Sequence, residues 1–480
     1  MQIPSMDVRD EHSATSELHA PYIWGIASVA ALGGLLFGYD WVVIGGAKPF
    51  YEAYFHLHSE QLIGWANSCA LVGCLLGSLA AGAFSDRIGR KRCLISSALL
   101  FASSSILTGW ADHFTSFVIW RIVGGLAIDL ASNVSPTYIA EISPARWRGR
   151  LVSLNQLALV VGILGAQIVN WLIAEKTPEA ITAAAFEQTW NVQSGWRWMF
   201  TAVALPAVIF LVTALFIPES PRWLITRGHE EKARQTLVRI GGDTYATEVL
   251  NDVHRSLLDE VRDGVQWREL LTPGLRRVLL IGVILAVLQQ WSGINVLFNY
   301  AEEIYRSAGY GVNEILFNIV ITGTINLVFT LIAMGCVDRF GRRSLMLWGC
   351  AGVGISHLLA SVAYWRNLHG TGVLVVTLCA IACYAVSLAP VTWVLITEIF
   401  PNRVRGMAVS IAVSALWAAA FLLTYTFPLL NRRLGTGGTF FCYGIICIAG
   451  GVFVFFFVPE TRGRSLEQIE DSMLVRTPTA

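Results

Sequence analysis

Long apolar stretches recur along the whole chain and are separated by short polar connections. Each stretch is long enough to cross a hydrocarbon core of about 30 Å as an α-helix. The pattern therefore predicts an all-α integral membrane protein. We expect its twelve transmembrane helices at 22–45, 61–84, 93–111, 115–138, 150–173, 196–217, 276–300, 313–336, 344–365, 371–397, 405–430 and 438–458.

One connection is longer and more charged than the others, and it follows a helical pattern. It divides the apolar stretches into two sets of six, which predicts two six-helix bundles joined by a cytoplasmic helical linker. The expected units are an N-terminal tail (1–21), a first bundle (22–217), the linker (218–275), a second bundle (276–458) and a C-terminal tail (459–480).

Composition excludes an ordinary soluble protein, because 55% of the 480 residues are hydrophobic and only 14% are charged. Residues 1–20 are polar, and the first apolar run leads directly into the multi-span pattern, so we expect no cleavable signal peptide. The formal net charge of +1 gives no reason to invoke nucleic acid.

Cationic residues concentrate in alternate connections. The connections 85–92 and 139–150 hold four and three Lys or Arg residues, whereas the opposite set is poor in them. The positive-inside rule places these basic loops in the cytoplasm. We therefore expect a multi-pass protein of the plasma membrane, the bacterial inner membrane, with both termini in the cytoplasm.

The loops of the two bundles repeat each other. Three motifs occur in the same order in each half, which indicates duplication of a six-helix unit. The pairs are GAFSDRIGRKR (82–92) with GCVDRFGRR (335–343), EISPARWRG (141–149) with EIFPNRVRG (398–406), and PESPR (218–222) with PETRG (459–463).

Charged residues in these motifs are placed at helix ends, where ion pairs between helices can hold the cytoplasmic side shut. We expect pairs within or across the halves, such as Glu141 with Arg148 and Glu398 with Arg405. Asp86 with Arg90 and Asp338 with Arg342 are expected to act likewise. The alternative is that the charges only set topology, but the positive-inside rule does not require the carboxylates. The expected gate residues are Asp86, Arg90, Glu141, Arg148, Glu219, Asp338, Arg342, Glu398, Arg405 and Glu460.

Three charged residues lie away from the ends of the predicted membrane helices: Asp40, Arg121 and Asp129. A charge at mid-membrane costs roughly 2.5–3.5 kcal/mol on insertion scales and needs a partner or a functional reason. Asp129 follows Arg121 by two helical turns. It could be a second acceptor for Arg121, a second protonation site or a hydrogen-bond partner of a substrate.

The seventh predicted helix is unusually polar, because Gln289, Gln290, Asn295 and Asn299 surround Gly293. Pro390 permits a bend in the tenth helix. Such interrupted helices build substrate sites near the membrane midplane. Any single amide could instead make an interhelical hydrogen bond, but the group favours a site for a hydroxyl-rich ligand.

Beyond the repeated loops, several motifs make the chain resemble the sugar porters of the major facilitator superfamily over residues 22–470. Within that family it is most similar to the bacterial D-xylose–proton symporters. The motifs are GGLLFGYD (33–40), RIVGG (121–125), PESPRWL (218–224), QQWSGIN (289–295), GTINL (323–327) and PVTWVLITEIFP (390–401).

The resemblance implies that Asp40 accepts a proton and that Arg121 is its partner, although a purely structural ion pair is the alternative. Protonation would weaken the pair and let the loaded carrier change the side to which it opens. Tyr300 is implied to stack on the sugar or to occlude it. The implied sugar contacts are Phe37, Gln167, Gln289, Gln290, Asn295, Asn299, Asn326, Trp393 and Trp417.

Several positions depart from the family in one direction, towards fewer hydrogen-bonding groups. Ile163, Leu416 and Ala420 stand where amides are usual, and Gln167 could partly compensate for the first. An apolar wall accepts a hydrogen or methyl group at modest cost, so we favour a pentose or a 6-deoxyhexose over glucose. Asp129 is also a departure, since similar proteins usually carry Gly there.

The resemblance thus implies proton-coupled uptake of a monosaccharide by alternating access, by a monomer in the lipid bilayer, without a cofactor or metal. A proton-independent facilitator would not need Asp40. A non-transporting sugar sensor usually has a long cytoplasmic tail, and the chain shows no Walker, HExxH or GxSxG motif that would suggest an enzyme.

Overall fold

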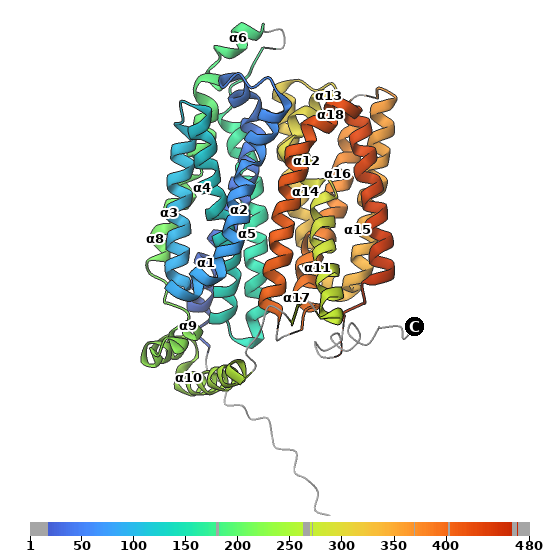
Figure 1. Cartoon of the computed structure of the whole chain (residues 1–480). Coiled ribbons are helices and arrows are strands. Elements are labelled where there is room, and N and C mark those ends of the chain that lie inside the picture. The colour runs from blue at the N-terminus through green and yellow to red at the C-terminus, as the bar shows by residue number, and fades with distance from the viewer. Residues whose placement is uncertain are drawn as a thin grey trace, which may run out of the picture.

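The computed structural model describes residues 18–178, 182–262, 269–270, 272–368, 370–401, 404–462 and 468. Figure 1 shows two helix bundles side by side, with two further helices beneath the first. All the regular elements of the described residues are helical. The predicted all-α class is confirmed.

The first bundle contains five long helices and a segmented sixth crossing. The segments of this crossing are η1 (Asn191–Gly195, a π-helix), α7 (Trp196–Thr201) and α8 (Ala204–Ala214), and the short α6 (Ala183–Glu187) precedes it. The long helices are α1 (Ala20–Tyr54), α2 (Glu60–Ile88), α3 (Arg90–Gly109), α4 (Phe114–Ile142) and α5 (Ala145–Ile173).

The linker forms α9 (Pro221–Thr226) and α10 (Glu230–Arg262). Both lie at the end of the bundle that also carries the repeated basic loops (Figure 1), and we call this the basic end. The amide of His19, at the start of α1, donates to the carbonyl of Ile240 at 2.9 Å. The linker is therefore packed against the first bundle.

The second bundle has two crossings that are broken into shorter helices. Its elements are α11 (Pro273–Trp291), α12 (Ile294–Asn299), α13 (Ala301–Ser307), α14 (Val312–Phe340), α15 (Arg342–Trp365), α16 (Thr371–Val386), α17 (Leu388–Glu398) and α18 (Arg405–Phe457). At about 1.5 Å per residue, α18 is far longer than a bilayer core. It turns back at Gly435, whose φ of 68° is left-handed.

Eleven helices among the described residues are long and apolar enough to cross a membrane, and α18 does so twice. The predicted twelve crossings are therefore confirmed. Glycines let these helices approach closely: a Cβ on Gly38 of α1 would lie 1.9 Å from the Leu159 carbonyl oxygen, and one on Gly162 of α5 would lie 2.0 Å from that of Leu35.

Candidate functional site

The polar stretch of the seventh crossing surrounds a helix break. Gly293 separates α11 from α12. Its φ of +81° lies in the left-handed region, which glycine adopts without strain. Gln289 and Gln290 therefore end one helix, while Asn295 begins the next. His357 Nε2 lies 2.8 Å from the Ser292 carbonyl oxygen at this break.

His357 of α15 is buried, at 1% exposure. Its contact with the Ser292 carbonyl gives it a definite role, because a carbonyl freed by a helix break needs a donor. No sequence motif predicts this contact, since α15 is far from Ser292 along the chain.

The amides at the break form a continuous chain. Gln289 Nε2 donates to the carbonyl oxygens of Leu388 and Ala389 at 3.4 and 3.3 Å. Gln290 Nε2 donates to Gln289 Oε1 at 3.3 Å, and Asn295 Nδ2 donates to Gln290 Oε1. The chain thus joins the two broken crossings, since Leu388 begins α17.

The bend expected at Pro390 lies three residues earlier. Ser387, with φ −124° and ψ −83°, separates α16 from α17, and Pro390 occupies the first turn of α17, where its missing N–H costs little. Trp393 follows on α17 and is half-buried.

Two other predicted amides are buried and have polar atoms without a protein partner among the described residues. Gln167 of α5 is 1% exposed, and both its Oε1 and its Nε2 are unpaired. Asn299 leaves Oδ1 unpaired in the same way. Buried polar groups normally have partners, so the unpaired atoms make these two amides candidate contacts for a ligand. Asn326 of α14 is also buried.

An aromatic cluster joins the two bundles. Phe37 and Trp41 of α1 lie with their ring centroids 6.0 and 5.8 Å from that of Trp417 in α18. Phe37 and Trp417 were expected at the site. Trp41 was not, although it lies one turn after Phe37 on the same helix face.

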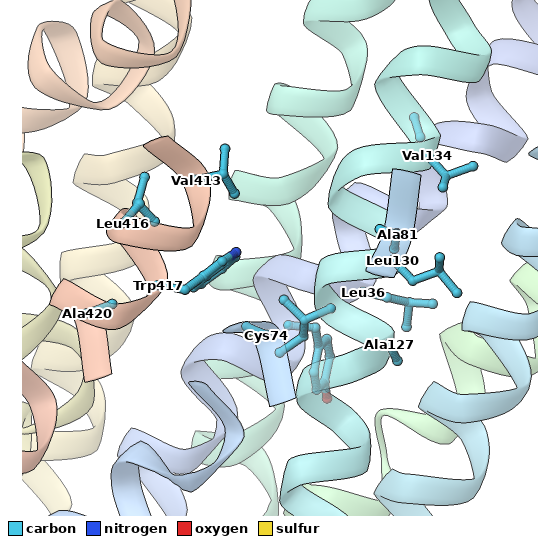
Figure 2. Close-up of a cluster of buried hydrophobic side chains, with 14 of the residues drawn as sticks. Leu36, Cys74, Ala81, Ala127, Leu130, Val134, Val413, Leu416, Trp417 and Ala420 are labelled. Carbon is cyan, nitrogen blue, oxygen red and sulfur yellow. The ribbon is translucent and has the colours of Figure 1, made fainter. Parts of the chain in front are cut away.

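Trp417 reaches from the second bundle to Asp129 of α4. Its Nε1 donates to Asp129 Oδ1 at 2.8 Å, and Asn133 Nδ2 donates to Asp129 Oδ2 at 2.9 Å. Figure 2 shows the indole extending from α18 towards the first bundle, with Leu416 and Ala420 on the same helix. Asp129 is therefore engaged by Trp417 and Asn133 and not, as one alternative had it, by Arg121.

Asp40 and Arg121 form a buried ion pair within the first bundle. Arg121 Nη1 donates to Asp40 Oδ1 at 2.8 Å, and the two residues are 3% and 2% exposed. The guanidinium also lies 5.4 Å from the ring centroid of Phe200. Asp40 Oδ2 has no hydrogen-bond partner among the described residues.

At the basic end, Arg90 of α3 binds two carboxylates. Its Nε and Nη2 donate to Glu141 at 3.1 Å each, and its Nη1 donates to Asp86 at 2.9 Å. The expected pair of Glu141 with Arg148 is thus replaced by Glu141 with Arg90. The reason is geometric: Arg148 lies exposed on the first turn of α5.

Glu219 caps the start of α3 from the linker side. It accepts hydrogen bonds from the Lys91 N–H at 3.0 Å and from the Ser220 N–H at 2.8 Å. Burial raises the pKa of the Glu219 carboxyl, and these N–H donors act in the opposite direction.

The second bundle repeats this arrangement. Arg342 Nη2 donates to Glu398 Oε1 at 3.3 Å, and Glu460 accepts from the Arg342 N–H at 2.8 Å. Arg405 Nε donates to the Phe400 carbonyl at 3.2 Å instead of reaching Glu398 as expected. The side chain of Asp338 lies outside the described residues, so its expected pair with Arg342 stays a prediction.

The opposite end ties the two bundles together. Thr177, after α5, and Asn313 of α14 exchange two hydrogen bonds, at 3.2 and 3.1 Å. Tyr300, the predicted occluding residue, donates to the Thr424 carbonyl at 2.7 Å, and its ring centroid lies 4.5 Å from that of Phe427 with the rings tilted by 41°. The charged pairs described at the basic end each join residues of one half. These contacts correspond to a molecule closed at the end opposite the linker.

No group of three or more His, Cys, Asp or Glu side chains that could hold a metal ion occurs in the described part of the chain. The polar groups gathered at the helix breaks are amides, which suit hydroxyl groups.

Comparison with known proteins agrees with this geometry. The chain is 37% identical to the D-xylose-proton symporter of Escherichia coli (strain K12), over 95% of this chain and 96% of that protein. It is also 37% identical to the arabinose-proton symporter of Bacillus subtilis (strain 168), over 93% and 94%.

A solved structure of the E. coli xylose transporter, described as a partially occluded inward open conformation, matches with a TM-score of 0.82. The two are 36% identical, and the match covers 93% of this chain and 100% of that one. The family described as Sugar (and other) transporter matches residues 26–473. The chain therefore belongs to the sugar transporter family, within the major facilitator fold.

Proposed function

We propose that the protein is a secondary active transporter that takes up a monosaccharide together with a proton by alternating access. The observation that carries the proposal is the presence of both a buried Asp40–Arg121 pair in the first half and a helix break lined by amides in the second. A facilitator needs the amides but has no use for an ion pair buried in the membrane. The names of the symporters to which the chain is similar support the same reading.

Asp40 is the proposed proton acceptor, and Arg121 holds it in place while it is ionised. Protonation removes the charge that binds the guanidinium, which loosens α1 from α4 and permits the loaded protein to reorient. Asp129 is proposed as a second protonation site. The hydrogen bond from Trp417 to Asp129 joins the two bundles. Protonation of Asp129 would weaken this bond, because a neutral carboxyl is a weaker acceptor than a carboxylate.

The sugar is proposed to bind between the bundles. Gln167, Gln289, Gln290, Asn295, Asn299 and Asn326 supply amides, and Phe37, Trp393 and Trp417 supply aromatic faces. The buried Ile163, Leu416 and Ala420 make part of the wall apolar. An apolar wall favours a pentose or a 6-deoxyhexose, because a hydroxyl facing it would lose its hydrogen bonds.

The basic end is proposed to face the cytoplasm, with both termini there, in the plasma membrane of a bacterium and with a monomer as the working unit. The two mobile units are residues 22–217 and 276–458, joined by the linker 218–275. The arginine and carboxylate pairs of the basic end, with Glu219 and Glu460, then form the inner gate. They pair within each half while the outer side is closed, and they are free to bridge the halves when it opens.

The test is uptake of labelled pentoses, hexoses and deoxyhexoses into proteoliposomes, with and without an inward proton gradient. Gradient-dependent accumulation of one of these sugars is the expected result. Equilibration without accumulation would make the protein a facilitator. Binding without flux would make it a sensor.

A further inference from the structure

Five charged side chains meet at the end of the molecule opposite the linker, where the two halves touch. Lys48 and Glu52 belong to α1 of the first half. Glu302, Glu303 and Arg306 belong to α13 of the second half, which Figure 1 places at the end opposite α9 and α10. We call these five residues the outer cluster.

Lys48 lies at the centre of the outer cluster and is only 1% exposed. Its Nζ lies 2.9 Å from Glu52 Oε1 and 3.8 Å from Glu302 Oε2, and it also contacts the Glu303 carboxylate. Arg306 pairs with Glu302 from the far side. A single lysine of the first half therefore holds two glutamates of the second.

Other titratable groups around the outer cluster do not offset its charge. They are Tyr51 of α1, Cys69 of α2, Tyr300 before α13 and Tyr443 of α18, all buried. Tyr and Cys are neutral near pH 7. Two cations thus face three carboxylates, so the closed cluster carries a net charge of −1 when every group is ionised.

Each half keeps a balanced pair when the halves separate. Lys48 stays with Glu52 on α1, and Arg306 stays with Glu302 on α13, because both pairs lie within one helix. Glu303 is the remaining group. Opening transfers it to water, where a glutamate ionises with a pKa of about 4.3. Closing returns it to a site where its side chain is 25% exposed and lies beside Lys48 and two other carboxylates. Burial and the two carboxylates raise the pKa of Glu303 by more than Lys48 lowers it, which favours the neutral form.

We propose that the outer cluster is an outer gate that takes up one proton when it closes. The proton balances the third carboxylate. Lys48 still joins the halves, through the charge of Glu302 at 3.8 Å and through a hydrogen bond to the carbonyl oxygen of the neutral Glu303. This inference rests on the alternating access proposed above, and it adds a proton site distinct from Asp40 and Asp129. A low pH outside then favours closure, which is the step that must follow loading of the proton and sugar from that side.

The gate can be tested without substrate by measuring the distance between spin labels at the outer end. Cysteines introduced at the exposed positions His113 and Arg366 place one label on each half, next to α4 and α15. The more accessible native cysteines must first be replaced by serine, namely Cys336, Cys379, Cys383 and Cys442. Glu303→Gln mimics the neutral glutamate, and Lys48→Met removes the bridge.

Because closing takes up one proton, raising the pH disfavours the closed state. The ratio of closed to open protein is expected to fall about tenfold for each unit by which the pH is raised between 5.5 and 7.5. Glu303→Gln is expected to abolish this slope and stay closed, and Lys48→Met to stay open. The matched control is Glu60→Gln, which removes the exposed pair with Arg432 between the same halves. It should retain the slope.

A wild-type ratio that does not change with pH, or a slope that persists in Glu303→Gln, would overturn the proposal. Closure of Lys48→Met at the wild-type level would equally remove the lysine from the gate. Because the distances need no sugar, these outcomes are independent of whether the uptake assay finds symport.

Discussion

The Asp40→Asn variant separates sugar accumulation from sugar binding. In the wild-type protein Arg121 Nη1 lies 2.8 Å from Asp40 Oδ1. Asparagine keeps the size of the side chain and an oxygen that can accept this hydrogen bond. It removes the negative charge and the proton that the charge can take up. We expect the variant to exchange sugar across the membrane but not to accumulate it.

The magnitude is worked for one proton per sugar, the proton carried by Asp40. A membrane potential of about 100 mV supplies about 2.3 kcal/mol per charge, which corresponds to about 50-fold accumulation. Wild type should approach this ceiling in proteoliposomes with an imposed potential, whereas the variant should equilibrate at a ratio of about 1. Counterflow of labelled sugar checks that exchange survives.

Stability must be measured in parallel, because the variant leaves Arg121 charged at 3% exposure. Breaking a buried ion pair costs about 3–5 kcal/mol, and the retained acceptor should reduce this. Asp252→Asn, which changes an exposed residue of the linker, is the matched control and should accumulate sugar like wild type. Accumulation by Asp40→Asn well above equilibrium would refute the reasoning.

Three further predictions concern other contacts. Gln167→Leu should leave Tm unchanged or raise it, because both amide atoms are unpaired among the described residues. It should nevertheless raise the KM for sugar by about 2- to 13-fold, the change that corresponds to losing one neutral hydrogen bond. Arg90→Ala should lower the free energy of unfolding by about 1–3 kcal/mol in a denaturation assay, whereas Arg148→Ala at an exposed site should change it by less than about 0.5 kcal/mol. His357→Phe keeps an aromatic ring but removes the donor to the Ser292 carbonyl, so it should raise the KM for sugar. His357→Gln provides a donor again and should bring the KM part of the way back. Equal KM values in wild type and both variants would contradict the role of His357 in positioning the break.

Much of the architecture could be predicted from the sequence, because helices that cross a bilayer must be long and apolar. The ion pair of Asp40 and Arg121 was implied by the resemblance to the sugar porters. The cost of buried charge alone predicted that Arg121 needs a partner, and it left Asp129 open as a second acceptor. The helix break at Gly293 followed from glycine within a polar stretch.

Contacts between distant segments were not predictable in the same way. The pairing of Glu141 with Arg90 rather than Arg148 depends on how each helix is rotated about its axis, which the loop motifs do not encode. The Trp417 bond to Asp129 and the outer cluster around Lys48 depend on how the two halves meet. No single segment of the sequence carries that information.

The most direct test of proton-coupled uptake is the proton movement that accompanies sugar entry. The transported sugar is added to lightly buffered vesicles without any imposed gradient, and the pH outside is recorded. Symport predicts that the medium becomes more alkaline when sugar is added, with about one proton entering per sugar. Sugar entry with no change in the external pH would contradict the account.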